Sequence, residues 1–319
     1  MRLTMVANPP SPQNLQLLRQ LGVADAVHYA MDDLPEEPDA LKAIRAIYAD
    51  AGLSWTVAES GPAIDRIVLG REGWQAQTER YKRIIGHLGA LGVEVIAYNF
   101  MPQVGGDAMV IRTAFDRQTR GGALTSGFRL ADVTPATLPH AETPIPRERM
   151  WDNLERFLRA VIPVAEAAGV RMAMHPDDPP LPMLCGLQRI MGSPADFDRL
   201  LGIVDSPANA VTLCFGCFAE GGHDIPALIR RWAGRTAFVH VRDIRGEIGD
   251  FIETFPDDGQ TDMPAAFRAL VETGFDGCVR SDHAPLLAGE AAHNDGYAMA
   301  GHIFAIGYLR GLAQSAEQG

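Results

Sequence analysis

The feature that most constrains the fold is a regular alternation of short apolar runs with longer amphipathic segments along the whole chain. In the longer segments apolar residues recur at spacings of three and four, the period of a helix with one buried face. Several of these segments end at a glycine, as helices often do. Eight strand–helix units in succession predict an α/β fold, the (β/α)8 TIM barrel. The expected strands are Leu3–Ala7, Ala24–Tyr29, Ser54–Glu59, Val93–Phe100, Arg171–His175, Ala210–Cys214, Ala237–Val241 and Gly277–Ser281. The expected helices are Pro12–Leu21, Asp39–Ala51, Trp74–Leu91, Arg147–Ala168, Pro194–Leu201, Ile225–Trp232, Met263–Thr273 and Ala298–Ala313.

The pattern predicts one barrel domain over residues 1–319, without an interdomain linker or internal repeat. An open doubly wound sheet is the alternative, but such sheets usually have fewer strands. One interval, at about 103–146, breaks the rhythm and is rich in Gly, Thr and Pro. Because it follows a strand, we expect it to be a long loop insertion over the C-terminal face of the barrel, where it could cover a site.

The charge balance restricts the partners. Forty acidic against 28 basic side chains give a formal net charge of −12. This field repels phosphate backbones and anionic lipids, so we expect neither a nucleic-acid nor a membrane partner. No apolar run is long enough to span a bilayer, and the N-terminus does not resemble a signal peptide. The four cysteines are expected to be free thiols of a cytoplasmic protein.

Polar residues close the last four predicted strands. Active sites of such barrels lie at the C-terminal ends of the strands. Any one of these residues alone would more often be a packed core residue, but all four on consecutive strands favour a metal site. Imidazole, thiolate and carboxylate together allow Mn²⁺, Fe²⁺, Co²⁺ or Zn²⁺. The four predicted metal ligands are His175, Cys214, His240 and Asp282, which follow one another at intervals of 39, 26 and 42 residues.

Residues beside these ligands suggest further roles. His283 follows Asp282 directly, so the two side chains point different ways, and an imidazole there is a candidate general acid or base. Asp177 and Asp178 lie in a proline-stiffened loop after His175, which suits orienting the ligands. A solvated turn is the alternative interpretation of this loop. Cys217 completes a C-x-x-C with Cys214, but without a second such pair it is a weak candidate ligand.

Four more residues at strand ends are candidates for binding a substrate. Glu59 and Asn99 close the third and fourth predicted strands. Arg242 and Arg280 lie at the ends of the seventh and eighth strands, where a guanidinium could hold a carboxylate through two hydrogen bonds. An anionic substrate is possible despite the acidic chain if these arginines supply the local positive charge that would hold it.

Several motifs resemble the mannonate dehydratase family in the family's own order. The most specific is His175-Pro-Asp-Asp-Pro-Pro180. The others are Glu59-Ser-Gly-Pro62, Tyr98-Asn-Phe-Met-Pro102, Leu213-Cys-Phe-Gly216, Phe238-Val-His-Val-Arg-Asp243, Arg280-Ser-Asp-His283 and Gly296-Tyr297.

The resemblance implies a xylose-isomerase-like barrel, a Mn²⁺-type divalent metal and a small sugar acid as substrate. It implies loss of water from D-mannonate, or a related aldonate, to give 2-keto-3-deoxy-D-gluconate or its counterpart. The positions that match the family's metal ligands are the four strand-end residues named above. His283 and Tyr297 match its proton-transfer positions, and similar proteins suggest a homo-oligomer.

Two other functions stay open. A sugar isomerase or epimerase could use the same barrel and metal, although such sites often have carboxylate-rich ligand sets. A non-catalytic relative could bind a sugar acid without converting it. The second alternative is motivated by the segment after Pro102, which reads Gln103-Val-Gly-Gly-Asp-Ala108 and departs from the family pattern.

Overall fold

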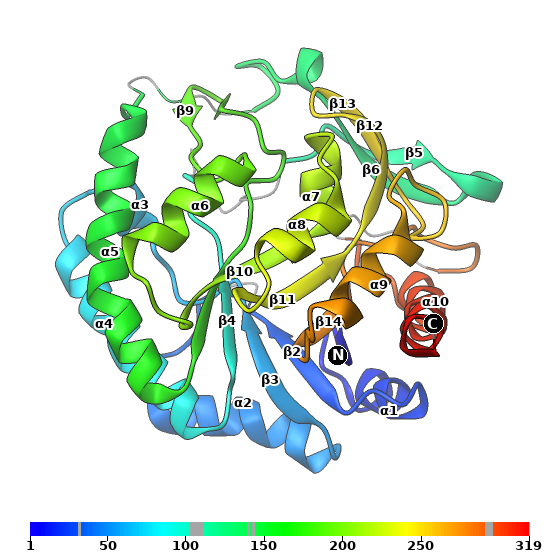
Figure 1. The fold of residues 1–319 in the computed structure, drawn as a ribbon, viewed down its shortest axis with the longest axis horizontal. Coiled ribbons are helices and arrows are strands. Elements are labelled where there is room, and N and C mark those ends of the chain that lie inside the picture. The colour runs from blue at the N-terminus through cyan, green and yellow to red at the C-terminus, as the bar shows by residue number, and fades with distance from the viewer. Residues whose placement is uncertain (31–32, 103–110, 139–140, 142–143, 291–295, 319) are drawn as a thin grey trace.

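The computed structural model forms a closed barrel of eight strands in which all neighbours are parallel (Figure 1). It describes residues 1–30, 33–102, 111–138, 141, 144–290 and 296–318. The predicted (β/α)8 barrel is therefore confirmed, and its strands match the predicted runs within two residues at either end. The strands, in barrel order, are β1 (Arg2–Val6), β14 (Cys278–Ser281), β11 (Thr236–Val241), β10 (Asn209–Cys214), β7 (Arg171–Met174), β4 (Val95–Tyr98), β3 (Ser54–Glu59) and β2 (Asp25–Tyr29).

The helices surround the barrel, and several of them begin at a residue whose side chain caps the first turn. Ser193 and Asp196 form a capping box at the start of α6, and prolines occupy the first turns of several helices. Gly169 ends α5 in the left-handed conformation, with a φ of 69°. The helices are α1 (Pro12–Gln20), α2 (Pro38–Asp50), α4 (Trp74–Ala90), α5 (Arg147–Ala168), α6 (Pro194–Ile203), α8 (Ile225–Arg231), α9 (Met263–Glu272) and α10 (Met299–Gln318), and two short ones, α3 (Asp65–Leu69) and α7 (Phe215–Glu220), were not predicted.

The core has two layers. Large aliphatic and aromatic side chains fill the space between the strands and the surrounding helices. Inside the barrel the packed residues are mostly small, including Val27, Val57 and Ala173, with Phe238 among them. The interior is therefore filled by side chains, and room for chemistry is left at the ends of the strands. Among the described helices, none combines the length and apolarity needed to cross a bilayer.

A second, antiparallel sheet was not predicted. It has the order β12-β13-β6-β5 and combines β12 (Asp243–Glu247) and β13 (Asp250–Thr254) with β6 (Leu124–Arg129) and β5 (Ala114–Gln118). Two of its strands come from the interval expected to be an insertion, of which 103–110, 139–140 and 142–143 lie outside the described residues. β12 begins two residues after the end of β11, which places this sheet at the C-terminal end of the barrel. The hairpin strands β8 (Met183–Leu184) and β9 (Leu187–Gln188) and the short 3-10 helices η1 (Arg120–Gly122) and η2 (Leu130–Asp132) complete the described elements.

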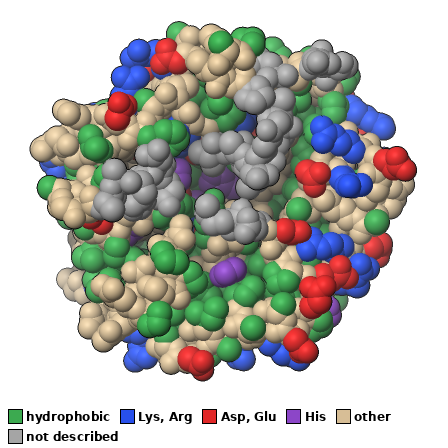
Figure 2. All heavy atoms as spheres, turned by 180° about the vertical axis from the view of Figure 1, so that it is seen from behind, with side chains coloured by type: hydrophobic (Ala, Val, Ile, Leu, Met, Phe, Trp, Pro, Cys, Tyr) green, Lys and Arg blue, Asp and Glu red, His purple; other side chains and the backbone are tan. Residues whose placement is uncertain are grey.

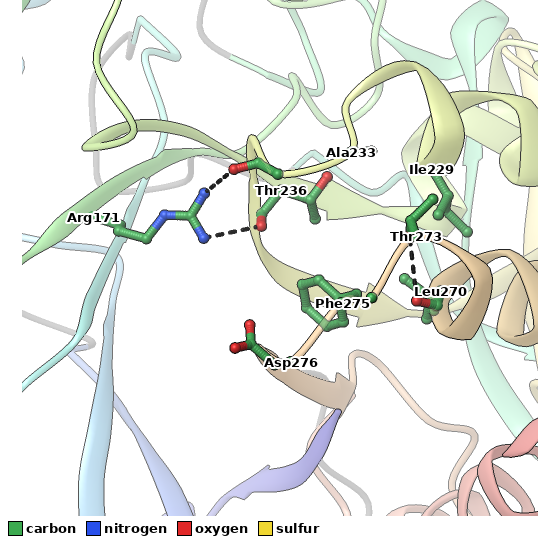
Figure 3. Close-up of a pocket in the computed structure, with 10 residues that line it drawn as sticks. Arg171, Ile229, Ala233, Thr236, Leu270, Thr273, Phe275 and Asp276 are labelled. Atoms are coloured by element: carbon green, nitrogen blue, oxygen red, sulfur yellow. Dashed lines mark hydrogen bonds between the residues drawn. The ribbon is translucent and has the colours of Figure 1, made fainter.

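The opposite, N-terminal end of the barrel contains a cavity of about 130 Å³ beside Arg171 (Figure 3). The Arg171 guanidinium donates to the carbonyl oxygens of Gly234 at 3.0 Å and Thr236 at 3.2 Å, and its Nε donates to that of Pro207 at 3.2 Å. In barrels of this class the N-terminal face serves stability, so we assign Arg171 a structural role.

We predict that Arg171→Met lowers the free energy of unfolding by about 1–3 kcal/mol, because three carbonyl groups lose a charged donor. Urea denaturation followed by circular dichroism measures the change. Arg171→Lys is the matched variant. We expect a smaller loss of unfolding free energy, because lysine keeps the positive charge although it lacks the planar guanidinium with its several donors. A Met variant as stable as the parent chain would contradict the assignment.

Candidate metal centre and active site

The four predicted metal ligands meet at the C-terminal end of the barrel. Ligand atoms of Cys214, His240 and Asp282 lie within 4.8 Å of one another, and those of His175, Cys214 and Cys217 do so as well. The rings of His175 and His240 are 5.1 Å apart between centroids. The centre is built by the ends of β7, β10, β11 and β14, and Figure 2 shows histidine side chains in a hollow of one face.

His175 has a fixed tautomer. Its Nδ1 lies 2.7 Å from the carbonyl oxygen of Pro176, which can only accept, so Nδ1 is the protonated donor. Nε2 of the neutral ring then carries the lone pair that a metal requires. Burial alone would lower the pKa of His175, but hydrogen bonding and charge from Cys214 outweigh it and raise the pKa to about 9. A bound cation therefore has to displace a proton here.

Cys214 and Asp282 supply the negative charge of the centre. Burial by itself raises the pKa of the Cys214 thiol, but hydrogen bonds from Cys217, His175 and His240 and the charge of Arg242 together bring it well below its usual range. The pKa of Asp282 is also held well below its usual range, because nearby cationic groups outweigh its burial. The Cys214 sulfur is 3.8 Å from Oδ2 of Asp282. A thiol and a carboxylate this close suit a shared cation, which would add to the positive charge that Arg242 and Arg280 already place beside Asp282.

The fit of a metal to this centre rests on the chemistry of its donor set. At His240, Arg280 donates to Nε2, so a metal bound at Nδ1 would replace the proton that this hydrogen bond leaves there. Nδ1 of His240 is buried, lies 3.8 Å from Oδ1 of Asp282, and has no hydrogen-bond partner in the described part of the chain. A buried polar atom of this kind costs free energy unless something binds it. Two imidazoles, one thiolate and one carboxylate are a donor set that suits a divalent transition metal.

Arg280 lies beneath the centre and is fully buried. Its guanidinium donates to Glu59, to Oδ1 of Asp282 at 3.0 Å and to the Tyr297 hydroxyl at 3.2 Å. Its Nε lies 3.2 Å from Nε2 of His240. Arg280 is thus surrounded by protein groups, and its position suits holding the ligands Asp282 and His240 in place.

Arg242 is likewise enclosed by protein groups. Its Nε lies 3.2 Å from Oδ2 of Asp282, and its Nη2 lies within 3.1 Å of both Asp178 and Cys217 and 3.0 Å from Glu220. Asp178, Cys217 and Glu220 also form a close group with ligand-type atoms, but this guanidinium already supplies the cation there. The arrangement accounts for Cys217 without a second metal.

The remaining predicted residues are placed as follows. Glu59 is buried, and although burial would raise its pKa, Arg280 and His240 lower it to about 2. Asn99 Oδ1 accepts from the Met101 amide at 3.1 Å. Asp177 accepts from the Met191 amide at 2.7 Å and so fixes the loop after His175. A substrate contact for Glu59 and Asn99 stays a prediction.

His283 and Tyr297 lie together at the rim. Their rings are 5.7 Å apart between centroids and nearly perpendicular. Nδ1 of His283 lies 2.8 Å from Oε1 of Glu253. Burial alone would lower the pKa of His283, but the charges of Glu253 and Asp282 raise it. Burial raises the pKa of Tyr297 well above its usual value. Asp282 thus faces the metal cluster while His283 faces the second sheet, as their adjacency predicted.

Sequence reasoning missed the buried charges that surround this centre. Glu253 comes from the second sheet, Arg112 precedes it, and Glu220 ends α7. Arg112 binds Asp178 through two hydrogen bonds of 2.6 and 2.9 Å, and it donates to Glu253 at 2.7 Å. The aromatic and β-branched residues of Phe251-Ile-Glu-Thr-Phe255 were a usable strand signal, but nothing local identified the charged partners.

Gly216 is required by the position of Arg242. A Cβ atom on Gly216 would lie 2.5 Å from Nε of Arg242 and 2.7 Å from its Cζ. The guanidinium cannot move aside without leaving carboxylates unpaired. We predict that Gly216→Ala lowers the free energy of unfolding by about 1–3 kcal/mol and weakens metal binding. Thermal unfolding with and without Mn²⁺ measures both effects.

Gly202 provides the control for this substitution. It lies within α6, and a Cβ there would meet nothing within 4 Å. Gly202→Ala should therefore stabilise the chain by about 0.5–1 kcal/mol, which is the usual gain for alanine in a helix. A Gly216→Ala variant that behaved like Gly202→Ala would show that Arg242 is not constrained as described.

Comparison with known proteins decides the family. The D-mannonate dehydratase (UxuA) family matches residues 1–319. Mannonate dehydratase 1 of Halalkalibacterium halodurans is 34% identical, and the alignment covers 96% of this chain and 93% of that protein. The chain belongs to the D-mannonate dehydratase family. The family resemblance inferred from the sequence motifs is thus confirmed.

Further comparisons agree with the assignment to the D-mannonate dehydratase family. The mannonate dehydratase of Bacillus subtilis is 32% identical, with 95% of this chain and 93% of that protein covered. The crystal structure of mannonate dehydratase from Streptococcus suis serotype 2 superposes with a TM-score of 0.90 at 28% identity, covering 100% of this chain and 95% of that chain. A xylose isomerase domain protein from Alicyclobacillus acidocaldarius has a TM-score of 0.66 at 14% identity, covers 99% of both chains, and shows the shared fold alone.

Proposed function

We propose that this chain is a metal-dependent hydro-lyase that removes water from D-mannonate, or a closely related aldonate, to give the 2-keto-3-deoxy acid. Dehydration of D-mannonate is consistent with membership of the D-mannonate dehydratase family. The observation that carries the proposal is that Cys214 forms one close group with His240 and Asp282 and another with His175. Asp282 is followed directly by His283, whose ring lies 5.7 Å from that of Tyr297.

The four strand-end residues would hold a divalent metal, and we propose Mn²⁺, with Fe²⁺, Co²⁺ and Zn²⁺ as the other candidates. When bound, the metal supplies Lewis-acid stabilisation of the negative charge that develops on a sugar acid as its C2 proton leaves. Arg280 and Arg242 hold Asp282 from two sides. Asp178 and Glu253 in turn hold Arg242. The protein thereby fixes the ligands before a substrate arrives.

The dehydration needs two proton transfers, and His283 and Tyr297 are the proposed groups. One takes the proton from C2, and the other protonates the hydroxyl that leaves C3 as water. The resulting enol then takes up a proton at C3 and becomes the ketone. Nε2 of His283 points away from Glu253 and is the reacting nitrogen. The Tyr297 hydroxyl is held by Arg280, whose guanidinium can only donate.

The test is conversion of D-mannonate by the purified chain. The protein is stripped with a chelator, reloaded separately with Mn²⁺, Fe²⁺, Co²⁺ or Zn²⁺, and incubated with a panel of hexonates and uronates. Loss of one water from D-mannonate, found by mass spectrometry and absent without metal, is the expected result. Isomerisation of an aldose, or sugar-acid binding without turnover under every metal, would overturn the proposal.

A further inference from the structure

We propose that Glu253, on β13 of the second sheet, is a positioning residue that keeps the proton of His283 on Nδ1 and so presents Nε2 to the substrate. The inference rests on the proposed function. It assigns the second sheet a part in the reaction, because this sheet carries the only described group that hydrogen-bonds to the His283 ring.

Glu253 is buried and its carboxylate is crowded by donors. Oε1 accepts from Nη2 of Arg112 at 2.7 Å and Nη1 of Arg242 at 2.8 Å, and it lies 2.8 Å from Nδ1 of His283. Oε2 accepts from the Ser126 hydroxyl at 2.6 Å. Four contacts on one carboxylate leave it a single orientation.

These contacts determine the tautomer. Both arginines carry a permanent charge, so the carboxylate between them is ionised and can only accept hydrogen bonds. Nδ1 of His283 must therefore donate. In the neutral ring the lone pair is then on Nε2, on the far side of the imidazole from Glu253, and the described residues give this atom no hydrogen-bond partner. Without Glu253 the two tautomers of His283 would interconvert.

The sheet fixes this carboxylate through its own pairing. Glu253 pairs with Ile244 of β12, and its neighbours Phe251 and Ile252 pair with Phe128 and Gly127 of β6. Arg112 binds both Glu253 and Asp178, so it also ties the sheet to the loop that follows His175. The position of His283 is thus coupled to the metal-binding loop through a continuous set of buried ion pairs.

The first test reads the tautomer in the unaltered protein. The chain is labelled with ¹⁵N-histidine and loaded with Zn²⁺, which is diamagnetic, and His283 is assigned by comparison with His283→Asn. Spectra are recorded at a pH high enough for the ring to be neutral, and there we expect the proton on Nδ1 and a pyridine-type nitrogen at Nε2. A proton on Nε2 of the neutral ring would overturn the inference. This result does not depend on the identity of the substrate, so it also separates failure of the inference from failure of the proposed function.

The second test is kinetic and uses the metal-loaded enzyme with D-mannonate. We expect Glu253→Gln to lower kcat about 10- to 100-fold with KM close to that of the parent, because the neutral amide no longer stabilises the charge that His283 gains when it takes up a proton. The double variant Glu253→Gln/His283→Asn should be no slower than His283→Asn alone, because Glu253 acts through His283. Additive losses, or an unchanged kcat in Glu253→Gln, would overturn the inference.

Glu247→Gln is the matched control. It removes the same charge from β12 of the same sheet, but at an exposed position. We expect its kcat to equal that of the parent chain. Should Glu253→Gln fold poorly, its circular dichroism and metal content reveal this, and the tautomer of the parent protein then decides the question.

Discussion

Replacing His283 by Asn is expected to lower kcat about 10²- to 10⁴-fold, the range typical of losing a general acid or base. The substitution removes Nε2, the proposed reacting nitrogen. The Asn side-chain amide can take the place of Nδ1 and donate to Glu253, so the buried carboxylate keeps a partner. The loss should therefore appear in turnover, with little change in fold or in metal affinity.

Three measurements on the same preparation separate these effects. Turnover of D-mannonate gives kcat, elemental analysis gives the metal bound per chain, and thermal unfolding reports stability. If His283→Asn keeps the metal content, the midpoint temperature of unfolding and the turnover of the parent chain, His283 has no part in the mechanism. Loss of metal together with turnover would instead place His283 among the groups that maintain the metal centre.

The barrel and the cluster of four polar residues at its strand ends were predictable from the sequence because both depend on local patterns. Strands and helices follow from apolar spacing, and parallel strands of one barrel bring their C-terminal ends to the same rim. A polar residue at the end of each strand therefore has a predictable neighbour. His175, Cys214, His240 and Asp282 came together for this reason, although they span more than a hundred residues of sequence.

Local sequence patterns did not predict the partners of the two arginines. Arg242 and Arg280 were expected to bind a substrate carboxylate, since guanidinium groups at a barrel rim often do. The structure instead surrounds them with protein groups, including Glu220, Glu253 and Asp178 around Arg242 and Glu59 beside Arg280. Whether an arginine faces a ligand or a buried carboxylate depends on partners far away in sequence.

The second sheet was missed for a related reason. β5 and β6 lie in an interval whose Gly, Thr and Pro content is typical of a loop. β6 becomes a strand by pairing with β13 more than a hundred residues later, and β5 pairs with β6. Strands that form by antiparallel pairing across such a separation have only a weak signal in their local sequence. Glu253 and Arg112 therefore became visible as site residues only in three dimensions, at 2.7 Å from one another.

Replacing Cys214 by Ser is the prediction with the second large effect. A serine hydroxyl keeps its proton at neutral pH, whereas Arg242 and the neighbouring donors hold the pKa of the buried Cys214 thiol well below its usual value and so favour the thiolate that binds metals. The variant loses one anionic ligand, and we expect metal affinity to fall at least about 100-fold. A ligand present at 100 times its Kd stabilises the folded state by about 2.7 kcal/mol, so most of that stabilisation should vanish.

Thermal unfolding at increasing Mn²⁺ concentration measures this loss without any substrate. The parent chain should unfold at a higher temperature as Mn²⁺ is added, and Cys214→Ser should show almost no shift over the same range. Cys185→Ser, a buried free cysteine of the β8–β9 hairpin outside the metal cluster, should shift as the parent does. An equal metal-dependent shift in Cys214→Ser would mean that the sulfur is not a ligand, because only binding to the folded state raises the unfolding temperature. The four strand ends would then meet around a cluster of buried charges held by Arg242 and Arg280 alone.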